Sequence, residues 1–348
     1  IELLTNNNYT VIVYDQKVNI DTKIKKKSEQ KTISRELVGT YTKGTYINNL
    51  SKSDSNCLMC IYVVNDIQKN GKYLKSVGLS CVDLSIGTVC VHNSFSEKYD
   101  ECIGLDETVR FISNFNPIEV LIFYDSMSQK DNKNIQEYLI SYLNLSSSKC
   151  KYSDNVNPKY KKITFQNEFL KKIYPNTDTL LTPIEQLNLE KYPNVIISLC
   201  LLCDYVYDKL PSLLTNNQEP TFYLDGHHLV LGNNAIYQLD IFENEQNSGC
   251  KLKYKSLFNV VNFCRTNLGE RYLKSILSSP LTSKSKLNKI YDITQKMIDL
   301  KIPSQIKQYL DLVRDIERLA RKLELKILKP YELSLLLSSY ENINTIHN

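Results

Sequence analysis

Two hydrophobic patterns divide the chain. Over roughly the first two hundred residues, short apolar runs rich in Val, Ile and Tyr alternate with turn residues, which is typical of strands. These runs predict strands over residues 10–15, 37–47, 57–66, 77–95 and 117–125, with a hairpin turning near Ser85–Gly87. Helical spacing predicts helices over 106–116 and 132–145, packed against a layered sheet. The polar stretch 146–162 predicts a loop.

After residue 210 the hydrophobic spacing becomes helical. One short extended segment, 222–232, comes first, and apolar residues then recur at helical spacing over 256–281, 283–302 and 304–328. Pro280 and Pro303 separate these helices. Gly269 interrupts the first of them, which indicates either a close backbone approach or a helix that starts just after Asn267.

The length of 348 residues suggests two or three domains. The patterns predict a multidomain protein, α/β followed by all-α, with segments 1–50, 51–210 and 211–348. The first segment starts in mid-element, as a truncated domain would, and Ile1 stands where a complete chain would have Met, so a longer parent is expected.

Charge is unevenly distributed along the chain. The total is +5, but residues 1–50 carry +3, residues 251–348 carry +9, and the middle carries −7. Basic ends suit a polyanion such as nucleic acid, and a solvated helical surface explains them equally well. The lysines at 23–27 fit either phosphate contact or a solvated loop. A hydrophobic content of 42% excludes a wholly disordered chain, and no run is long enough to span a membrane.

The ten cysteines indicate small buried thiols in a reducing intracellular compartment more than a disulfide framework. Two Cys-x-x-Cys pairs, Cys57/Cys60 and Cys200/Cys203, could supply four zinc ligands. However, the first pair lies on a predicted strand, where positions i and i+3 face opposite ways, and the second lies in an apolar helical run. Core packing is therefore favoured over zinc.

Catalytic motifs are scarce. The sequence has neither a G-x-x-x-x-G-K-[ST] nor a G-x-G-x-x-G phosphate loop, and its four histidines form no nucleophile triad. Asp83 and Asp125 each end an apolar strand, as do the metal-binding carboxylates of ribonuclease-H-like nucleases. The alternative is that both aspartates cap turns or helices. The charged run Arg314–Arg318 predicts a solvated helix face, with Asp315–Arg318 and Glu317–Arg321 pairs.

Residues 264–281 read CRTNLGERYLKSILSSPL, and residues 313–333 read VRDIERLARKLELKILKPYEL. The first resembles the Thr-Pro-Met-Gly-x-Arg-x-Leu signature that opens the helical core of MutS mismatch-repair proteins, followed by its Pro-Leu. The second is similar to the family's Asp-hydrophobic-Glu-Arg-Leu-x-x-Arg segment. Asn267 replaces the usual Pro. The matching residues are Thr266, Gly269, Arg271, Leu273, Leu277, Pro280, Leu281, Asp315, Glu317, Arg318, Leu319, Arg321, Pro330 and Leu333.

Three upstream stretches extend the resemblance. Thr42-Lys43-Gly44-Thr45 takes the place of the Thr-Pro-Gly-Thr that ends the mismatch-binding domain, with Asp15-Gln16 before it. GLSCVDLSIG resembles the connector's Ala-x-x-Asp-x-Ser-x-Gly, with Asp83, Ser85 and Gly87 in the matching places. LVLGNNAIYQLDIF resembles the strand and turn that enter the core, with Gly232 and Ala235 replacing the usual Asp and Thr.

The resemblance implies a fragment of a MutS-type protein, with the order of its segments preserved. Residues 1–50 would end the α/β mismatch-binding domain, 51–210 would form a ribonuclease-H-like connector without nuclease chemistry, and 211–348 would begin the helical lever or core domain. The divergence and composition indicate a giant-virus or organellar branch. Asp83 would then be a structural residue.

The implied activity belongs to the parent. It would bind mismatched double-stranded DNA, pair with a second MutS-type subunit as a homo- or heterodimer, and use ATP and Mg²⁺ in a domain beyond this chain, which by itself should not hydrolyse ATP. Arg35 is the first candidate for DNA contact, and Lys23, Lys25, Lys26 and Lys27 are further ones. Two other hypotheses remain: a metal-dependent nuclease using Asp83 and Asp125, and a non-catalytic interaction module.

Overall fold

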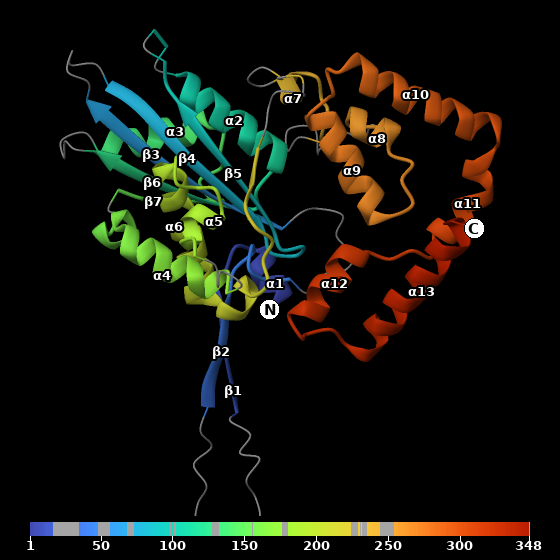
Figure 1. Cartoon of the computed structure of the whole chain (residues 1–348), viewed down its shortest axis with the longest axis horizontal. Helices are drawn as coiled ribbons and strands as arrows, with labels where there is room; N and C mark the ends of the chain where they lie inside the picture. Colours follow the sequence, from blue (N-terminus) through green and yellow to red (C-terminus); the bar gives the residue numbers. More distant parts are fainter. Residues whose placement is uncertain are drawn as a thin grey trace, which may run out of the picture.

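The computed structural model describes most of the chain in three connected parts (Figure 1). We call them the N-terminal ribbon (1–47), the sheet region (56–223) and the helical region (254–347). The described residues are 1–16, 35–47, 56–67, 73–97, 99–100, 102–126, 132–154, 156–175, 180–223, 229, 231, 235–243 and 254–347.

The N-terminal ribbon contains a short helix and a strand pair. Helix α1 spans Glu2–Asn6, and strand β1 (Val11–Gln16) pairs antiparallel with β2 (Arg35–Tyr41). The first predicted extended run is confirmed, and the second is confirmed only as far as Tyr41, because residues 43–45 form a turn. In Figure 1 this pair projects away from the rest of the molecule. Ile12, Tyr14, Leu37 and Val38 are exposed on it. The ribbon therefore contributes little to the core of the described chain.

The sheet region is built on six strands in the order β7-β6-β3-β4-β5-β8. Their bounds are β3 Cys57–Ile67, β4 Tyr73–Asp83, β5 Thr88–Phe95, β6 Glu119–Ser126, β7 Cys150–Ser153 and β8 Thr221–Phe222. The β3/β4 and β4/β5 pairs are antiparallel, and the other pairs are parallel. The hairpin predicted near Ser85–Gly87 is confirmed as the turn between β4 and β5.

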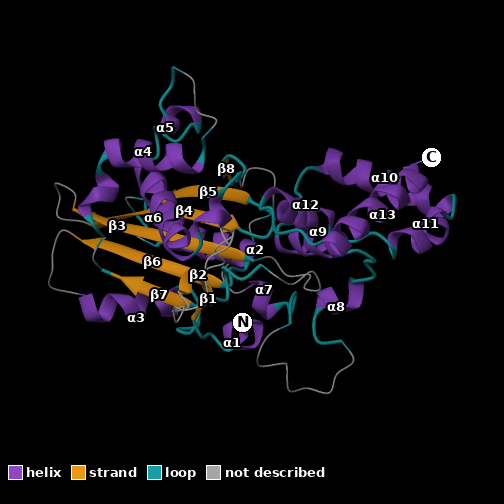
Figure 2. Cartoon of the chain, turned by 90° about the horizontal axis from the view of Figure 1, so that it is seen from below, coloured by secondary structure: helices purple, strands orange, loops and turns teal. Residues whose placement is uncertain are grey.

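Helices cover both faces of this sheet, as Figure 2 shows. Helices α2 (Ile103–Phe115) and α3 (Asn132–Tyr142) lie on one face, as predicted. Helices α4 (Ile163–Ile173), α5 (Pro183–Gln186) and α6 (Pro193–Lys209) lie on the other. Because both faces are buried, alternate residues of β3 are apolar on both sides: Leu58, Cys60 and Tyr62 on one, and Met59, Ile61 and Val63 on the other.

Helix α6 is the central support of one face. Most of its side chains are buried, and its Ser198 hydroxyl lies 2.8 Å from that of Ser80 on β4. Gly78 allows this approach, since a Cβ there would lie 2.1 Å from the Asn194 carbonyl oxygen. A close helix–strand contact thus explains one glycine inside a strand.

The stretch predicted as a loop over 146–162 contains regular structure. Strand β7 pairs parallel with β6, and a 3₁₀ helix, η1, spans Pro158–Lys161. The prediction was wrong there because β7 is a short edge strand whose four residues include no long apolar run. A second 3₁₀ helix, η2 (Pro211–Leu214), follows α6.

The helical region contains more breaks than the sequence pattern predicts. Its helices are α8 Leu257–Val261, α9 Asn267–Ser278, α10 Lys284–Asp299, α11 Ile302–Leu310, α12 Ile316–Glu324 and α13 Pro330–His347. The helical periodicity crosses two caps: Thr266 accepts from the Gly269 amide (3.1 Å), and Asp315 accepts from the Arg318 amide (3.3 Å). Gly269 therefore lies in the first turn of a helix that begins at Asn267, which was one of the two predicted alternatives.

One further segment differs from the sequence-based expectation. Ala235–Gln238 forms a short helix, α7, where the resemblance implied a strand and turn. The Gly232 of that motif lies outside the described residues. None of the helices in the described part of the chain is long and apolar enough to cross a membrane.

Candidate functional site: the junctions at one end of the sheet

The proposed nuclease pair is separated by the strand register. Asp83 lies opposite Cys57 on β3, whereas Asp125 lies opposite Val64. Seven residues of one strand correspond to about 23 Å at roughly 3.3 Å per residue. The two carboxylates therefore cannot share a pair of metal ions, and the hypothesis of a joint nuclease site is wrong. It failed because β4 runs antiparallel to β6, so that Asp83 and Asp125 lie at opposite ends of the sheet's strands.

Each aspartate has a structural role instead. Asp83 accepts hydrogen bonds from the amide (2.9 Å) and hydroxyl (2.6 Å) of Ser85, and its carbonyl accepts from the Gly87 amide. Asp125 accepts from the Tyr62 hydroxyl at 2.6 Å and pairs with Lys161. Burial raises the pKa of Asp125, but the bonds from Lys161 and Tyr62 outweigh it, and the pKa lies below its ordinary value. The turn-capping alternative is confirmed for Asp83.

The Cys-x-x-Cys pairs also belong to the core. Cys57 and Cys60 pack in opposite clusters of the sheet region, as predicted for i and i+3 on a strand. Burial raises the pKa of Cys60 and of Cys200 to about 12, which keeps both thiols protonated at neutral pH. Across the part of the chain that the structure describes, no His, Cys, Asp and Glu side chains are grouped to hold a metal ion.

The Thr42–Thr45 turn joins the N-terminal ribbon to the sheet. The Thr42 amide donates to the Thr45 hydroxyl (2.8 Å), and the Thr45 amide donates to the Thr42 hydroxyl (3.3 Å), so the turn is closed by its own side chains. The Thr42 hydroxyl also donates to Glu119 at 2.9 Å. Gly44 allows this docking, because a Cβ there would lie 2.3 Å from the Leu58 side chain.

Glu119 is the acceptor that this docking depends on. It starts β6 and is only 7% exposed. Besides Thr42, it accepts from the Tyr205 hydroxyl (2.6 Å) and pairs with Lys151 of β7. A buried carboxylate needs such partners. Glu119 was not among the residues predicted from the sequence, although it is a lone acid at the start of the apolar run IEVLIFYD.

The two helical-core motifs meet through an ion pair. Arg271 of α9 donates to both oxygens of Asp315 (2.5 and 2.9 Å) and to Glu317 (2.7 Å). Asp315 also caps α12. Burial by itself lowers the pKa of Arg271, but these bonds outweigh it and raise the pKa above its ordinary value. Segments 44 residues apart in sequence are thus fixed together by a bidentate contact.

Helix α12 is much more buried than predicted. Arg318, Arg321 and Lys322 are 4%, 1% and 3% exposed. The solvated-face interpretation of the charged run was therefore wrong for Asp315 and Arg318, although Arg314 and Glu317 are exposed. The Asp315–Arg318 pair is present at 3.5 Å, whereas Arg321 pairs with Glu324 instead of Glu317. Tertiary packing places this charged helix between two regions, and the local sequence carries no sign of that.

Arg321 connects the helical region to the sheet region. Its guanidinium donates to the carbonyl oxygens of Leu213 (2.9 Å), Thr215 (2.9 Å) and Asn216 (3.0 Å), and to the side-chain oxygen of Asn217 (2.5 Å). All four acceptors follow α6. The sequence identified Arg321 as a motif residue and gave no indication of these acceptors.

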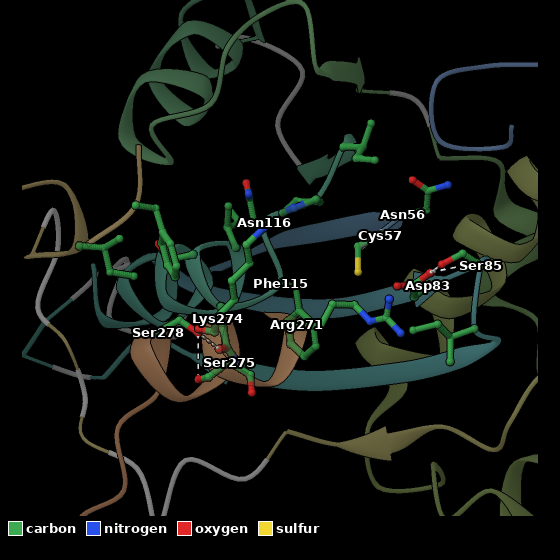
Figure 3. A pocket seen from close by; sticks show the side chains of 18 of the residues that line it. Asn56, Cys57, Asp83, Ser85, Phe115, Asn116, Arg271, Lys274, Ser275 and Ser278 are labelled. Atoms are coloured by element: carbon green, nitrogen blue, oxygen red, sulfur yellow. Dashed lines mark hydrogen bonds between the residues drawn. The ribbon is translucent and has the colours of Figure 1, made fainter. Parts of the chain in front are cut away.

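A cavity of about 1880 Å³ separates the sheet end from α9 (Figure 3). Figure 3 shows Lys274, Ser275 and Ser278 on α9 near Phe115 and Asn116, which follow each other at the end of α2. Ser278 and Ser279 donate to Asn114 of α2 at 3.0 and 2.8 Å, which closes one side. Pro280 follows and accepts from the Leu229 amide through its carbonyl. The cavity is therefore a space between the sheet and helical regions, and residues of the N-terminal ribbon such as Thr5 and Lys43 also line it.

The predicted DNA-contact residues lie away from these junctions. Arg35 begins β2, is exposed, and pairs in register with Gln16 near the far end of the N-terminal ribbon. Lys23, Lys25, Lys26 and Lys27 lie outside the described residues. The structure thus leaves Arg35 accessible at the projecting end of the molecule, which fits the prediction and does not test it.

One segment of the chain matches a known protein family. Residues 234–348, which include α9, α12 and their Arg271–Asp315 contact, match the family model of MutS domain III. The protein is therefore one that carries this domain, located in its helical region.

Whole-chain relatives extend this match to the sheet region. The entire chain is 33% identical, over 366 aligned residues, to a putative DNA mismatch repair protein, a MutS homologue, of Acanthamoeba polyphaga mimivirus, of which it covers 32%. It is 26% identical over 91% of its length to DNA mismatch repair protein MutS of Caldanaerobacter subterraneus, covering 33% of that protein. A mitochondrial MutS homologue of Sarcophyton glaucum is 28% identical over 56% of the chain, which covers 18% of that relative.

The chain belongs to the MutS family. It spans about a third of the length of its first curated relatives. The giant-virus and organellar relatives agree with the branch inferred from divergence and composition.

Proposed function

We propose that this chain is the part of a MutS-type protein that links its DNA-contacting end to its helical lever. The observation that carries this proposal is the match to the mimivirus relative, which runs through the ribbon, sheet and helical regions without omitting any of them. The parent binds mismatched duplex DNA and couples that binding to ATP binding and hydrolysis, with a second MutS-type subunit as its partner.

The division of labour follows the segments given by the sequence. Residues 1–50 end the mismatch-binding domain, 51–210 form the connector and 211–348 begin the lever. A ribonuclease-H-like connector is supported by the mixed sheet, in which β4 alone runs antiparallel to the strands beside it. Strand β8 (Thr221–Phe222) adds residues beyond 210 to that sheet.

ATP and Mg²⁺ are assigned to a domain outside this chain, since the chain's residues do not fit them. Its sequence contains no phosphate-binding loop of the G-x-x-x-x-G-K-[ST] type. What this chain supplies is the connection between the sheet and helical regions through Arg321, and a helical region in which the Arg271–Asp315 pair holds α9 to α12. The isolated chain is expected to hydrolyse no ATP.

A charge reversal tests DNA binding by the parent. Arg35→Glu should weaken binding to a mismatched duplex by about tenfold and reduce the slope of log affinity against log salt by about 1 or more. The matched control is Arg314→Glu, which reverses an exposed arginine of the helical region and should change neither quantity. Fluorescence anisotropy over a salt series measures both.

Two outcomes of that titration contradict the proposal. An unchanged affinity and salt slope in Arg35→Glu would remove Arg35 from the DNA contact. Equal affinity of the wild-type parent for mismatched and matched duplexes would contradict mismatch recognition itself, and would favour a non-catalytic interaction module.

A further inference from the structure

Arg321 is a buried cation whose partners lie mostly in another region of the molecule. It belongs to α12 of the helical region, and its side chain is 1% exposed. Four of its five acceptors belong to residues 213–217 of the sheet region, and the fifth is Glu324 on its own helix. Three of the four are backbone carbonyls, which stay in place only while the 213–217 turn keeps its conformation. The hydrogen bonds of the guanidinium therefore form only when that turn has this conformation.

The β4–β5 turn is shaped to receive the same guanidinium. Gly87 has a φ of +85°, and a Cβ at this position would lie 3.0 Å from the Arg321 Cζ and Nε atoms. The Gly87 carbonyl also accepts from the Gln218 amide at 2.8 Å. Two turns of the sheet region are thus held to each other and to one side chain of α12. Glycine is required here both by the backbone conformation and by the space.

Lys322, the next residue, provides an internal comparison. It is as buried as Arg321, but its partner is Glu332 of α13 at 2.7 Å, within the helical region. Consecutive buried cations on α12 therefore act in different places: Lys322 holds the helical region together, and Arg321 holds that region to the sheet.

The N-terminal ribbon docks at the same end of the sheet. Thr42 binds Glu119, which pairs in register with Leu58, and the neighbouring Cys57 pairs with Asp83 at the start of the Gly87 turn. Strands β6, β3 and β4 are adjacent, so the two docking points are separated by two strand spacings, about 10 Å. The ribbon and α12 thus contact different residues at the same end of the sheet: Glu119 for the ribbon, and Gly87 with residues 213–217 for α12.

We propose that Arg321 is a positioning residue: it locks the helical region onto the Gly87 and 213–217 turns, so that movement of the ribbon docked at Glu119 reaches the helices. That Arg321 holds the two regions together rests on its contacts alone. That a movement of the ribbon is passed on to the helices rests on the proposed function. The lock has an engaged state, with the guanidinium in the turns, and a released state in which the two regions move independently.

Hydrogen exchange on the full 348-residue chain tests the lock directly. Arg321→Met should raise amide exchange in segments 84–87 and 213–218 by about tenfold or more, because several hydrogen bonds to a charged group are lost. Exchange in the interior of β3 and β4 should stay unchanged. Gly87→Ala, which crowds the guanidinium from the other side, should give the same pattern. Arg321→Lys should give an intermediate one, since an ammonium cannot satisfy all these acceptors.

Lys322→Met is the matched control. It should raise exchange in α12 and α13 while leaving 84–87 and 213–218 protected. Unchanged protection of the two turns in Arg321→Met would overturn the proposal, and so would their equal loss in Lys322→Met, because either result would mean that Arg321 does not specifically hold the regions together.

Nucleotide exchange in the DNA-binding parent tests the consequence. Arg321→Met should reduce the stimulation of ADP release by mismatched DNA by about tenfold, with DNA affinity retained. Retained stimulation would overturn the relay. If the wild-type parent shows no DNA dependence at all, the proposed function fails, and the hydrogen-exchange result still decides whether Arg321 is the lock.

Discussion

The sheet region and the helical region are stabilised in different ways. The sheet has two continuous apolar clusters, and its buried charged residues in the described chain are Asp83 and Glu119. In residues 254–347, the buried apolar side chains are Phe258, Val313, Leu319 and Leu336. The same segment buries five charged side chains: Asp315, Arg318, Arg321, Lys322 and Glu332. Buried ion pairs therefore contribute more to the packing of the helical region than buried apolar side chains do.

Because the two regions are stabilised differently, substitutions in them should lower stability in different ways. An apolar core loses stability in proportion to the volume removed, and its neighbours partly relax. A buried ion pair responds abruptly, because the removal of one partner leaves a charge with no counterion in a place without water.

Glu332→Ala should destabilise the helical region most. Both side chains of the Lys322–Glu332 pair are nearly inaccessible, and breaking such a pair costs about 3–5 kcal/mol. Thermal unfolding followed by circular dichroism measures the change. The double variant Lys322→Met/Glu332→Leu should recover most of the loss, and a double variant no better than the single one would contradict the ion-pair explanation.

Leu202→Ala should destabilise the sheet region by about 2–5 kcal/mol, through lost burial and a cavity under β3 and β4. Leu337→Ala in α13, where the side chain is 58% exposed, is the matched control and should change stability by less than about 0.5 kcal/mol. Urea unfolding measures both. Similar losses at the two sites would mean that α13 is covered in solution, and would weaken the comparison of the two regions.

Acid should loosen the helical region through Glu332. Burial raises the pKa of Glu332, but bonds from Lys322 and the Lys329 amide outweigh it, and the pKa lies below its ordinary value of 4.5. Since the folded pKa is the lower one, the stabilisation is present above pH 4.5 and is lost as pH falls through the folded pKa. Melting temperatures from pH 6 to pH 3 should fall less steeply in Glu332→Gln. An identical slope would show that other carboxylates carry the acid sensitivity.

Thr266→Ala should give the smallest effect, about 1 kcal/mol, because the Gly269 amide at the start of α9 loses its acceptor. Ser283→Ala is a control with the same kind of residue at the start of α10, where no side-chain cap bond exists, and it should be nearly neutral. Equal effects of the two substitutions would show that the Thr266 cap adds nothing specific. Differential scanning calorimetry resolves shifts of this size.

Sequence patterns predicted the long strands of the sheet region and helices α2, α3 and α6, but not α4. Their segments carry strong periodicity and sit between clear turn residues, so local and tertiary preferences agree. Strand β7 was missed because an edge strand of four residues needs little apolar sequence. The break at Asp315 was missed because apolar spacing continues across that cap, whereas Gly269 had indicated a helix start near Asn267 as one alternative.

The candidate site was also predicted only in part from the sequence. The motifs themselves fixed which residues matter: Thr42 and Gly44, Gly87, Arg271, and the charged run of α12. The motifs and their order also indicated the MutS family from the sequence alone. Which charge meets which acceptor depends on long-range contacts, and no local pattern encodes them.

Sequence alone therefore determined most strands of the sheet region, the change to helices after residue 210, and the family of this protein. Only the tertiary structure decided that Asp83 and Asp125 lie at opposite ends of the strands and that Glu119 accepts the hydrogen bond from Thr42 of the ribbon. It also decided that Arg321 is buried against two turns of the sheet region. The physical reason is that periodicity reports which face of an element is buried. Strand direction, register and the pairing of buried charges depend on residues tens to hundreds of positions apart.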